Sequence, residues 1–577
     1  MTVRLDGVRT ASYSRTVAPS WGHPPDLEHT TTMTTARSLF PMIAVAAGGA
    51  LVALAGYAPA SPSTGSGERI EGGTVVYAHQ QEPPCVFGGW IEQAYLSYQV
   101  LDSLLSLDED GTPVPWLAES FAVSDDQLTW TFQLKPDVSF TDGSALTAAV
   151  VAYNFDYWVN GGNSTAAVWL GGYYESAEAV DDLTLAVHLS KPYPALAQTV
   201  TQGYFGIQSQ EALETRTDEE NCEAPIGTGA FVVEEWNRGS DIQLVRNEEY
   251  TSWPANALHT GPANVERVDW RFVADATTRV AALQSEEVDA IYDVPAVSWK
   301  GLDDAGYELQ KFVTPGRPQQ LAFNTSRGVF ADEKVRQAFA YSLDRKQTVE
   351  TIGQGVIPFE GNGGVSQATP GYSQKAADWY DYDPDKAVSL LEEAGWTDED
   401  GDGIRTKDGE PLTVILPYGA GSIINADGAA ILQGVQEQAK TVGFDVELIP
   451  VPQSELFAGA YSKSEEKDIS VGYWTAVTSG ILYINWRQST PDNPNYWNQA
   501  FYDSPELEGY ILEGNSAVDQ EESFAAYGKA QDYIAEHALS IGLYDRLSTL
   551  AVGSKLKDVW QEHAQGGPTF YDAYLID

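Results

Sequence analysis

The sequence predicts a mixed α/β protein built from two or three domains. Its 577 residues are too many for a single hydrophobic core. The composition, with 43% hydrophobic residues and 16 Trp, is typical of packed globular proteins and not of disordered chains. Residues 411–451 follow the pattern strand, helix, strand, and this order favours a partly parallel sheet.

The elements are predicted one by one from hydrophobic spacing and turn residues. Leu128, Trp130, Phe132 and Leu134 alternate with polar residues, which predicts a half-buried strand. Residues 160–174 are rich in Gly, Asn and aromatics and predict a long loop. In chain order, the predicted strands lie at 73–79, 128–134, 183–189, 231–236, 242–245, 264–272, 288–295, 411–417 and 444–451, and the predicted helices at 91–105, from 147, at 276–283, 332–345, 387–396 and 426–443.

The charge excludes one class of partner. The formal net charge is −49 at pH 7, with 82 acidic residues against 33 Lys and Arg. Nucleic-acid binding needs Lys and Arg to neutralise phosphates, so we expect no nucleic-acid partner. An acidic surface favours solubility, and we expect a monomer.

Residues 1–60 predict a start extension followed by a secretory signal. Residues 1–32 are polar and irregular, so we expect translation to begin at Met33. Arg37, an apolar run over residues 39–56 and Ala58-Pro-Ala60 then form the signal. The apolar run is also long enough, at the lower limit, for a retained membrane anchor. Residues 61–71 predict a flexible tether.

The end of the apolar run bears on the location of the protein. Leu54-Ala-Gly-Tyr57 resembles a lipoprotein box with Tyr57 in place of the Cys that would carry the lipid. Without a thiol no lipid can be attached at this position. We therefore expect an extracellular protein, cell-surface associated or secreted, without a lipid anchor at residue 57.

The stretch 222–253 predicts a hairpin around which the chain is organised. Gly227 and Gly229 bracket Thr228 and allow a tight backbone path. Residues 231–236 form the first strand, 237–240 the turn and 242–245 the return strand.

Two further stretches carry extended patterns. Pro115-Trp-Leu-Ala-Glu-Ser is followed by Ser124-Asp-Asp and by Phe140-Thr-Asp-Gly-Ser-Ala-Leu-Thr-Ala, where Thr147 is the expected helix cap. Gln320-Leu-Ala-Phe-Asn-Thr precedes Phe330-Ala-Asp-Glu-Lys-Val-Arg-Gln-Ala-Phe-Ala-Tyr-Ser-Leu-Asp-Arg. In this last stretch Asp332 is the expected cap, and the residues predicted to share one helical face are Val335, Ala338, Phe339 and Leu343.

Together, the hairpin and these two stretches resemble the signatures of the family 5 extracellular solute-binding proteins. This family holds the peptide, opine, oligosaccharide and nickel-complex receptors of ABC importers. The resemblance covers residues 72–577 and departs at Thr141, Ala149-Val150 and Glu286, where the family usually has His, an acidic pair and Gly. Arg336 and Asp344 are interpreted as an ion-paired framework and not as ligand contacts.

The resemblance implies a two-lobed periplasmic-binding-protein fold of class II, the large three-subdomain type, with a hinge and an interlobe cleft. It implies that residues 72–108, 220–314 and 543–577 form lobe I, that 109–219 are an inserted subdomain of lobe I, and that 315–542 form lobe II. The lobe junctions are expected near 314–318 and 542–544, and residues 535–544 resemble the crossing strand that returns the chain to lobe I. The implied partners are an oligopeptide or another small solute, an ABC permease and its ATPase.

The ligand-binding residues are predicted from this resemblance and from loops that follow strands. Aromatic side chains in a cleft stack on ligands, and neutral hydroxyls suit a sugar or an amide. The predicted ligand-binding residues are Glu82, Phe87, Trp90, Tyr204, Gln320, Tyr473, Trp474 and Thr475.

One position sets the peptide prediction against an alternative. In the peptide receptors that the chain resembles, a Trp is followed three residues later by an Asp that pairs with the α-ammonium group of the peptide. Here Trp474 is followed by Val477. A buried ammonium without a counter-charge is costly, so either Asp492 or another acid supplies the charge, or the ligand is an oligosaccharide or another solute with uncharged ends.

The two cysteines and one acidic loop remain open. Cys85 and Cys222 suggest one disulfide in an exported chain, the alternative being two free buried thiols. Asp398–Glu410 copies the first half of a calcium-binding loop, but Gly409 occupies the twelfth position, where Glu is required. A solvated turn is favoured over a calcium site, and we expect no metal and no cofactor.

Two other classes of protein are alternatives to a receptor, namely a secreted hydrolase and a surface adhesin or sensor. A secreted hydrolase would need a catalytic set. The chain has no Gly-x-Ser-x-Gly or His-Glu-x-x-His motif, and its five histidines beyond residue 60 are scattered in sequence, so we expect no catalytic residues and no enzyme. A surface adhesin or sensor on the same fold cannot be separated from a receptor by sequence.

Overall fold

The computed structural model describes residues 67–162, 164–359, 361, 363–398, 401–421, 423–491 and 494–577. The chain divides into two units, residues 1–60 and 61–577, and every element named below belongs to the second. The predicted start extension and signal, with Met33 and Tyr57, lie outside the described residues, as do residues 61–66 of the tether. No helix within the described ranges is long and apolar enough to cross a membrane.

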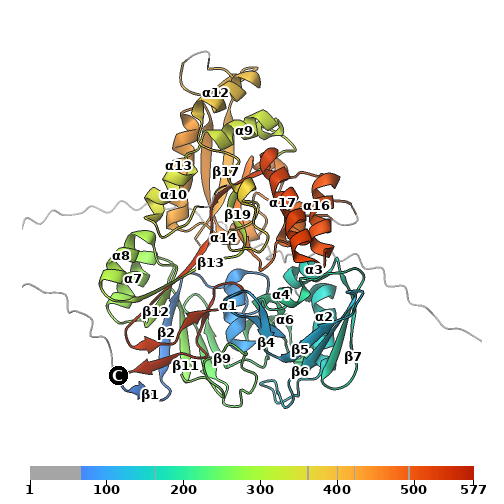
Figure 1. Ribbon diagram of the computed structural model, residues 1–577. Helices are drawn as coiled ribbons and strands as arrows, with labels where there is room; N and C mark the ends of the chain where they lie inside the picture. The colour runs from blue at the N-terminus through green and yellow to red at the C-terminus, as the bar shows by residue number, and fades with distance from the viewer. Residues whose placement is uncertain are drawn as a thin grey trace, which may run out of the picture. The chain divides into compact units, whose positions relative to one another are not determined.

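The largest sheet has seven strands in the order β13-β21-β12-β2-β11-β10-β9 (Figure 1). Strand β2 pairs in parallel with β11 and β12, and the other neighbours are antiparallel. Tyr77 and Ala78 of β2 point to opposite faces, one packing with α1 and the other with α7 and α8. The bounds are β2 Thr74–His79, β9 Phe231–Asn237, β10 Asp241–Arg246, β11 Arg267–Phe272, β12 Ala290–Tyr292, β13 Glu308–Val313, β21 Leu547–Val552, α1 Ile91–Val100, α7 Ala276–Gln284 and α8 Ala296–Asp304.

A four-stranded antiparallel sheet, β5-β6-β8-β7, forms from the segment between α1 and the hairpin. The predicted alternation in β6 is confirmed, since Trp130, Phe132 and Leu134 are buried and their neighbours are half-buried. Thr147 caps α2, as predicted. The bounds are β5 Ala118–Val123, β6 Thr129–Leu134, β7 Tyr174–Ala179, β8 Thr184–Leu189, α2 Ala148–Tyr157, η1 Trp158–Gly162, α3 Ser164–Leu170, α4 Leu196–Thr199, η2 Gly203–Phe205, α5 Gln210–Thr215 and α6 Asp218–Glu223.

A three-stranded antiparallel sheet, β19-β14-β20, lies beside a parallel pair, β17-β18. The predicted strand, helix, strand order is confirmed, because β17 and β18 pair in parallel along their full length with α13 between them. The bounds are β14 Gly316–Phe323, β17 Thr413–Ala420, β18 Asp445–Pro452, β19 Ile469–Thr475, β20 Ser540–Tyr544, α9 Glu333–Tyr341, α10 Arg345–Gly353, α12 Pro384–Glu393, α13 Ala426–Lys440, α15 Ile481–Trp486, α16 Pro505–Ser516 and α17 Gln520–Glu536.

The remaining elements are short. They are β1 Arg69–Ile70, β3 Leu105–Leu107, β4 Pro113–Pro115, β15 Thr406–Lys407, β16 Glu410–Pro411, β22 Leu556–Lys557, β23 Trp560–Gln561, β24 Pro568–Thr569, β25 Tyr574–Ile576, α11 Gln374–Ala377, α14 Gln453–Phe457, η3 Val329–Ala331 and η4 Ser464–Glu466.

Helix α9 shows that the residues of the pattern at 330–345 support the fold. Its predicted apolar face is buried in the core behind β14, and Asp332 caps the helix. Arg336 donates to the carbonyl oxygens of Phe330 and His537 and lies 3.7 Å from the Glu333 carboxylate. Asp344 caps α10 instead of pairing with Arg336, so the two residues hold the framework separately.

Two predicted elements are wrong. The segment 160–174 is not a loop, because η1 and α3 occupy most of it. Trp169 and Leu170 of α3 are buried, and this burial outweighs the local Gly content. The predicted helix 91–105 ends at Val100, where Leu101 takes an extended conformation and leads the chain to Asp102.

Asp102 anchors the central hairpin to the end of α1. Its carboxylate accepts hydrogen bonds from the hydroxyls of Thr228, at 2.9 Å, and of Ser252. Gly227 and Gly229 bring the backbone against Val100, whose carbonyl oxygen accepts the Gly229 N–H. A Cβ at either glycine would meet the Val100 backbone within 2.3 Å, which explains why glycine flanks Thr228.

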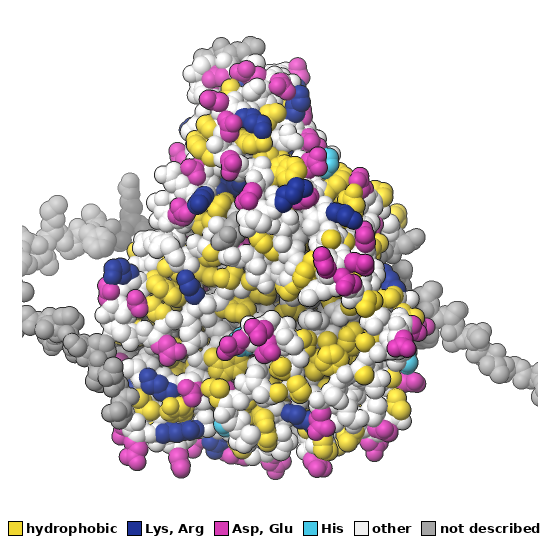
Figure 2. All heavy atoms as spheres, viewed as in Figure 1, with side chains coloured by type: hydrophobic (Ala, Val, Ile, Leu, Met, Phe, Trp, Pro, Cys, Tyr) yellow, Lys and Arg dark blue, Asp and Glu magenta, His cyan; other side chains and the backbone are white. Residues whose placement is uncertain are grey.

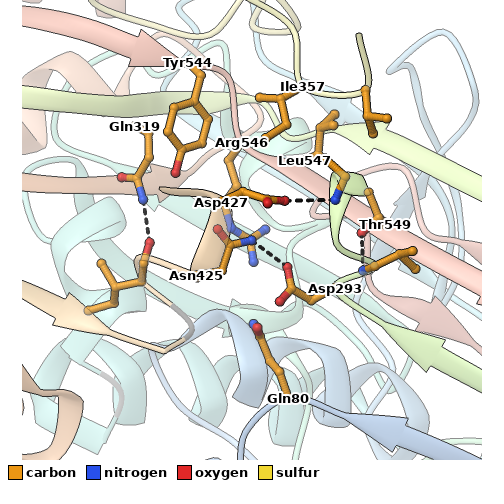
Figure 3. A pocket seen from close by; sticks show the side chains of 14 residues that line it. Gln80, Asp293, Gln319, Ile357, Asn425, Asp427, Tyr544, Arg546, Leu547 and Thr549 are labelled. Atoms are coloured by element: carbon orange, nitrogen blue, oxygen red, sulfur yellow. Dashed lines mark hydrogen bonds between the residues drawn. The ribbon is translucent and has the colours of Figure 1, made fainter. Parts of the chain in front are cut away.

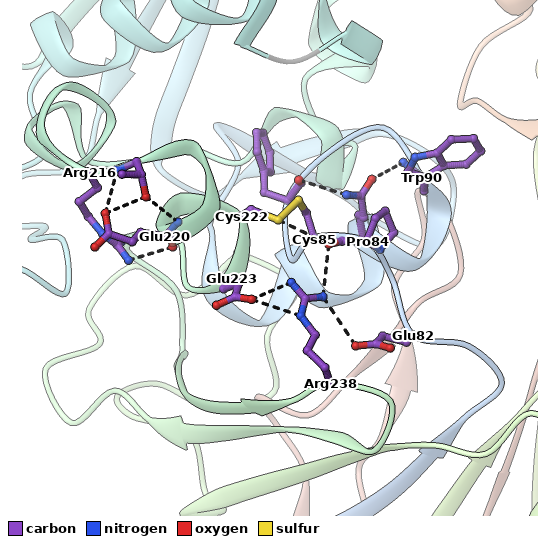
Figure 4. The surroundings of a disulfide bond; sticks show 12 residues. Glu82, Pro84, Cys85, Trp90, Arg216, Glu220, Cys222, Glu223 and Arg238 are labelled. Atoms are coloured by element: carbon purple, nitrogen blue, oxygen red, sulfur yellow. Dashed lines mark hydrogen bonds and ion pairs between the residues drawn. A yellow bond between two sulfur atoms is a disulfide. The ribbon is translucent and has the colours of Figure 1, made fainter. Parts of the chain in front are cut away.

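A disulfide joins Cys85 and Cys222, which links the loop after β2 to α6 (Figure 4). Beside it, Arg238 pairs with Glu223 at 2.9 Å and its guanidinium lies 3.6 Å from the centre of the Trp236 ring. The loop of residues 80–90 is therefore fastened to the hairpin side of the seven-stranded sheet.

Two crossing segments connect the seven-stranded and three-stranded sheets. Thr314–Pro315 joins β13 to β14, and Asp545–Arg546 joins β20 to β21. Strands β13 and β21 pair antiparallel, as do β14 and β20, and the Thr314 N–H donates to the Arg546 carbonyl at 2.9 Å. The two sheets thus share one continuous antiparallel ribbon. The lobe boundaries given above stay a prediction.

Substituting Gly316 tests how tightly this ribbon is packed. Gly316 has φ +113°, and a Cβ there would lie 2.1 Å from the Trp474 carbonyl oxygen. We expect Gly316→Ala to destabilise the protein by about 2 kcal/mol or more, because strain and clash add. Gly301→Ala in α8, where nothing lies within 4 Å, is the matched control and should be neutral or slightly stabilising. Equal thermal midpoints for the two variants would show that the backbone at Gly316 is not packed as tightly as the structure indicates.

Asp102 gives a pH-dependent prediction. Burial raises its pKa to about 7, although the hydrogen bonds from Ser252 and Thr228 oppose the shift. The folded state then holds a proton that the unfolded state has lost, so this contribution to stability is complete below about pH 4 and is lost as the pH rises through 7. Burial raises the pKa of Glu562 to about 7 in the same way.

We therefore expect Asp102 and Glu562 to lower the thermal midpoint as the pH rises from 5 to 8. The thermal midpoint of Asp102→Asn should change with pH by a correspondingly smaller amount in this direction, because the variant lacks one of the two carboxyl groups whose pKa is raised to about 7. Calorimetry across this pH range measures both slopes. Parallel slopes would show that Asp102 does not hold the extra proton.

Candidate functional site

A pocket lies where the seven-stranded sheet and the three-stranded sheet meet (Figure 3). One wall comes from the end of β2, the segment after β12 and the start of β21. The other wall comes from β14, the end of β20 and the segment that leads into α13. Its lining residues are Gln80, Asp293, Val294, Ala296, Gln319, Val356, Ile357, Ile423, Asn425, Asp427, Tyr544, Arg546, Leu547 and Thr549.

Two hydrogen bonds cross the pocket between the walls. The Asn425 side-chain amide donates to the Asp293 carboxylate at 2.8 Å. The Ala296 backbone N–H donates to the Asp427 carboxylate at 3.0 Å. Asn425 also caps α13, and Ala296 is the first residue of α8, so each bond uses a helix N-terminus, where backbone N–H groups lack intrahelical partners.

The two carboxylates of the pocket are in different electrostatic states. Asp293 lies 3.1 Å from the buried guanidinium of Arg279 and accepts the Asn425 hydrogen bond, so its charge is compensated. Burial raises the pKa of Asp427; the hydrogen bond from Ala296 opposes this shift and the charge of Asp293 adds to it. Asp427 is therefore the carboxylate of this pocket whose charge is poorly compensated.

Arg546 brings a positive charge to the same pocket. It is 8% exposed and belongs to a crossing segment. Its guanidinium donates to the hydroxyl of Tyr292 at 2.9 Å and, at longer range, to those of Tyr95 and Thr314. The ring of Tyr473 lies 4.4 Å from the guanidinium carbon, which is a cation–π distance.

Four of the predicted ligand-binding residues lie together next to this pocket. Tyr473 contacts Arg546, and Trp474 packs edge-on against Trp497 at 4.4 Å. The hydroxyls of Tyr204 and Thr475 are 2.9 Å apart, and this bond links η2 to β19. Tyr473, Trp474 and Thr475 are consecutive residues of β19, Tyr204 comes from η2, and none of the four lines the pocket itself.

The other predicted residues lie elsewhere. Gln320 is buried on β14 and accepts a hydrogen bond from Ser540. The Glu82 carboxylate accepts hydrogen bonds from the Trp236 indole and the Gly239 N–H, at the hairpin turn. It also lies 3.6 Å from the Arg238 guanidinium (Figure 4). Phe87 packs against two hydrophobic cores, and Trp90 precedes α1 as its N-cap. None of these lines the pocket.

Sequence reasoning missed the residues that do line the pocket. Arg546 lies two residues after the predicted strand 535–544, Asn425 directly precedes the predicted helix 426–443, and Asp427 is its second residue. Polar residues at the end of a strand or the start of a helix were the available signal in the sequence. Hydrophobic periodicity does not show which strand end lies next to which helix start in space.

The structure describes Val477 and part of the acidic loop that resembles a calcium-binding loop. Val477 is 6% exposed and packs against Leu107 and Ala564, and Asp492 lies outside the described residues. Asp398 accepts the backbone N–H groups of Gly401 and Gly403, as in a turn, and Asp400 lies outside the described residues. Among the described residues, no group of three or more His, Cys, Asp or Glu side chains is placed to hold a metal ion.

Comparison with known proteins identifies the family. The profile described as "Bacterial extracellular solute-binding proteins, family 5 Middle" matches residues 112–504, more than half of the chain. The nickel-binding periplasmic protein of Escherichia coli is 27% identical over 371 residues, 63% of this chain and 68% of that protein. The glutathione-binding protein GsiB of Pectobacterium atrosepticum is 28% identical over 440 residues, 75% of this chain and 80% of that protein.

A solved structure shows the same fold. The oligopeptide-binding protein AppA of Bacillus subtilis, in complex with a nonapeptide, superposes with a TM-score of 0.75 at 22% identity, over 88% of this chain and all of that chain. The two-lobed periplasmic-binding-protein fold expected from the sequence is thereby confirmed. The chain belongs to the bacterial extracellular solute-binding proteins of family 5, which are binding receptors of ABC importers and not enzymes.

Proposed function

We propose that this receptor captures an oligopeptide in the pocket between the two sheets and delivers it to an ABC permease and its ATPase. It acts outside the cytoplasmic membrane as a monomer without a cofactor. The observation that carries the proposal is the pocket itself, because its walls come from two sheets that the antiparallel ribbon connects. The crossing segments serve as the hinge of the predicted lobes.

The chemistry of the pocket supports a peptide. Gln80, Gln319 and Asn425 offer amide groups, which suit the alternating donors and acceptors of a peptide backbone. An ammonium group of the ligand needs a negative charge nearby, which Val477 does not carry. Asp427 supplies this charge from the pocket wall. The relatives include a glutathione-binding protein and an oligopeptide-binding protein, and both names describe peptide ligands.

An oligosaccharide, or another solute with uncharged ends, is the second candidate. Val477, buried beside Leu107 and Ala564, carries no carboxylate at the position where the receptors that the chain resembles pair an Asp with a peptide ammonium. Neutral groups such as Thr549 and Tyr544 also line the pocket. Hydroxyls and tyrosine rings of this kind suit sugar rings.

A ligand screen separates the two candidates. The refolded, ligand-stripped chain is heated with di- to pentapeptides or with neutral oligosaccharides. We expect peptides to raise the thermal midpoint, because a ligand at one hundred times its dissociation constant adds about 2.7 kcal/mol. Mass spectrometry should recover the peptide unchanged. A shift with sugars alone would favour the second candidate, and turnover of the ligand would remove the receptor assignment.

The hydrogen bond across the pocket gives a second test. Asn425→Ser keeps a side chain that caps α13 but is too short to reach Asp293. We expect peptide affinity to fall about five- to tenfold, because a hydrogen bond formed across the closed pocket contributes about 1 kcal/mol. Titration calorimetry measures the affinity. Ser504→Ala, which removes a helix cap away from the pocket, is the control and should lower stability but not affinity.

A further inference from the structure

Arg546 differs from Arg279, the arginine that pairs with Asp293 of the pocket, in how its hydrogen bonds are used. An arginine has five N–H donors. Arg279 uses all five, on the carbonyl oxygens of Tyr292, Val273, Ala274 and Asp293 and on the Asp293 carboxylate. Arg546 makes three hydrogen bonds, all to neutral hydroxyls. At least two of its N–H groups have no acceptor among the described residues.

Arg546 and Arg279 also differ in their ion pairs. Among the described residues, Arg279 pairs with Asp293, whereas no carboxylate forms an ion pair with Arg546. The Nε atom has no hydrogen-bond partner among the described residues and is accessible to solvent, and Arg546 is one of the residues that line the pocket. A buried guanidinium in this state is stabilised by any anion that can approach it.

We infer that Arg546 binds a carboxylate group of the solute. The free N–H groups of a guanidinium match the two oxygens of a carboxylate, which is the strongest pairing available to either group. The inference rests on the proposed function and narrows it: for an oligopeptide, the carboxylate is the C-terminal one or that of an acidic side chain. A neutral oligosaccharide cannot satisfy Arg546.

The surroundings of Arg546 fix its position for this role. The Tyr473 ring lies against the guanidinium, and the Tyr292 hydroxyl accepts from Nη2. The Arg546 carbonyl oxygen accepts the Thr314 N–H, so the residue is part of the ribbon that joins the sheets. A carboxylate bound here contacts the chain at the junction, where small changes in the ribbon alter the relative placement of the two pocket walls.

The acids of the pocket do not replace the ligand carboxylate. Asp293 is already engaged by Arg279 and Asn425. Asp427 accepts the Ala296 N–H and forms no ion pair with Arg546 among the described residues. Asp427 instead remains available for an ammonium group, so the pocket offers one site for each end of a zwitterion.

Matched ligands test the inference on the unaltered protein. Titration calorimetry compares a peptide that carries a free C-terminal carboxylate and no acidic side chain with its C-terminal amide. We expect the amide to bind about 10- to 100-fold more weakly, because a charge-assisted hydrogen bond is lost. Arg546→Gln should weaken the acid by the same factor and leave the amide nearly unchanged. Arg546→Lys keeps the positive charge but loses the paired N–H groups, so its affinity for the acid should lie between those of the natural chain and Arg546→Gln.

The possible results separate the inference from the proposed function. Equal affinities for acid and amide, in the natural chain and in Arg546→Gln, would overturn the inference and leave the peptide receptor standing. Binding of a non-peptide carboxylate such as a sugar acid, lost in Arg546→Gln, would overturn the peptide proposal and support the inference. Binding of neutral oligosaccharides alone would overturn both. Because the acid and amide comparison needs no variant, misfolding of Arg546→Gln cannot obscure the result.

Discussion

The antiparallel ribbon through the two crossing segments is the constraint on which the rest of the structure depends. β13 and β21 belong to the seven-stranded sheet, and β14 and β20 belong to the three-stranded sheet. Within the described part of the chain, the backbone hydrogen bond that continues the ribbon from one sheet to the other joins Thr314 and Arg546. The sheets must be held together elsewhere by side chains, such as the Tyr204–Thr475 and Asn425–Asp293 pairs. Contacts of that kind can be broken and remade without unfolding either sheet.

The distribution of charge follows from the same architecture. Acidic side chains are spread over the face seen in Figure 2, where water solvates them. Several arginines are buried instead, and Arg279, Arg336 and Arg345 donate to backbone carbonyl oxygens at the ends of elements. This arrangement satisfies carbonyl groups that have no other donor. Arg546 is the exception near the pocket, because its partners are hydroxyls and an aromatic ring.

Local patterns predicted the elements well and failed where tertiary contacts decide. The apolar face of α9, the cap at Thr147 and the parallel pairing of β17 with β18 were all predicted. The segment 160–174 was predicted as a loop because Gly and Asn dominate it, but Trp169 gains more by burial than the segment loses in helix propensity. The early end of α1 is decided by the hydrogen bonds that Asp102 makes beyond it.

The sequence by itself determined the family, the fold class and the framework positions, since glycines at 227 and 229 and the 330–345 pattern reflect local backbone needs. It also determined that no acidic residue stands three positions after Trp474, where the chain has Val477. Only the tertiary structure decided which polar residues meet in the pocket. Arg546, Asp427 and Asn425 come from segments whose separation in sequence carries no information on their distance in space. Their chemistry depends on burial and on the partners that they lack, and both are set by the packing of one sheet against the other.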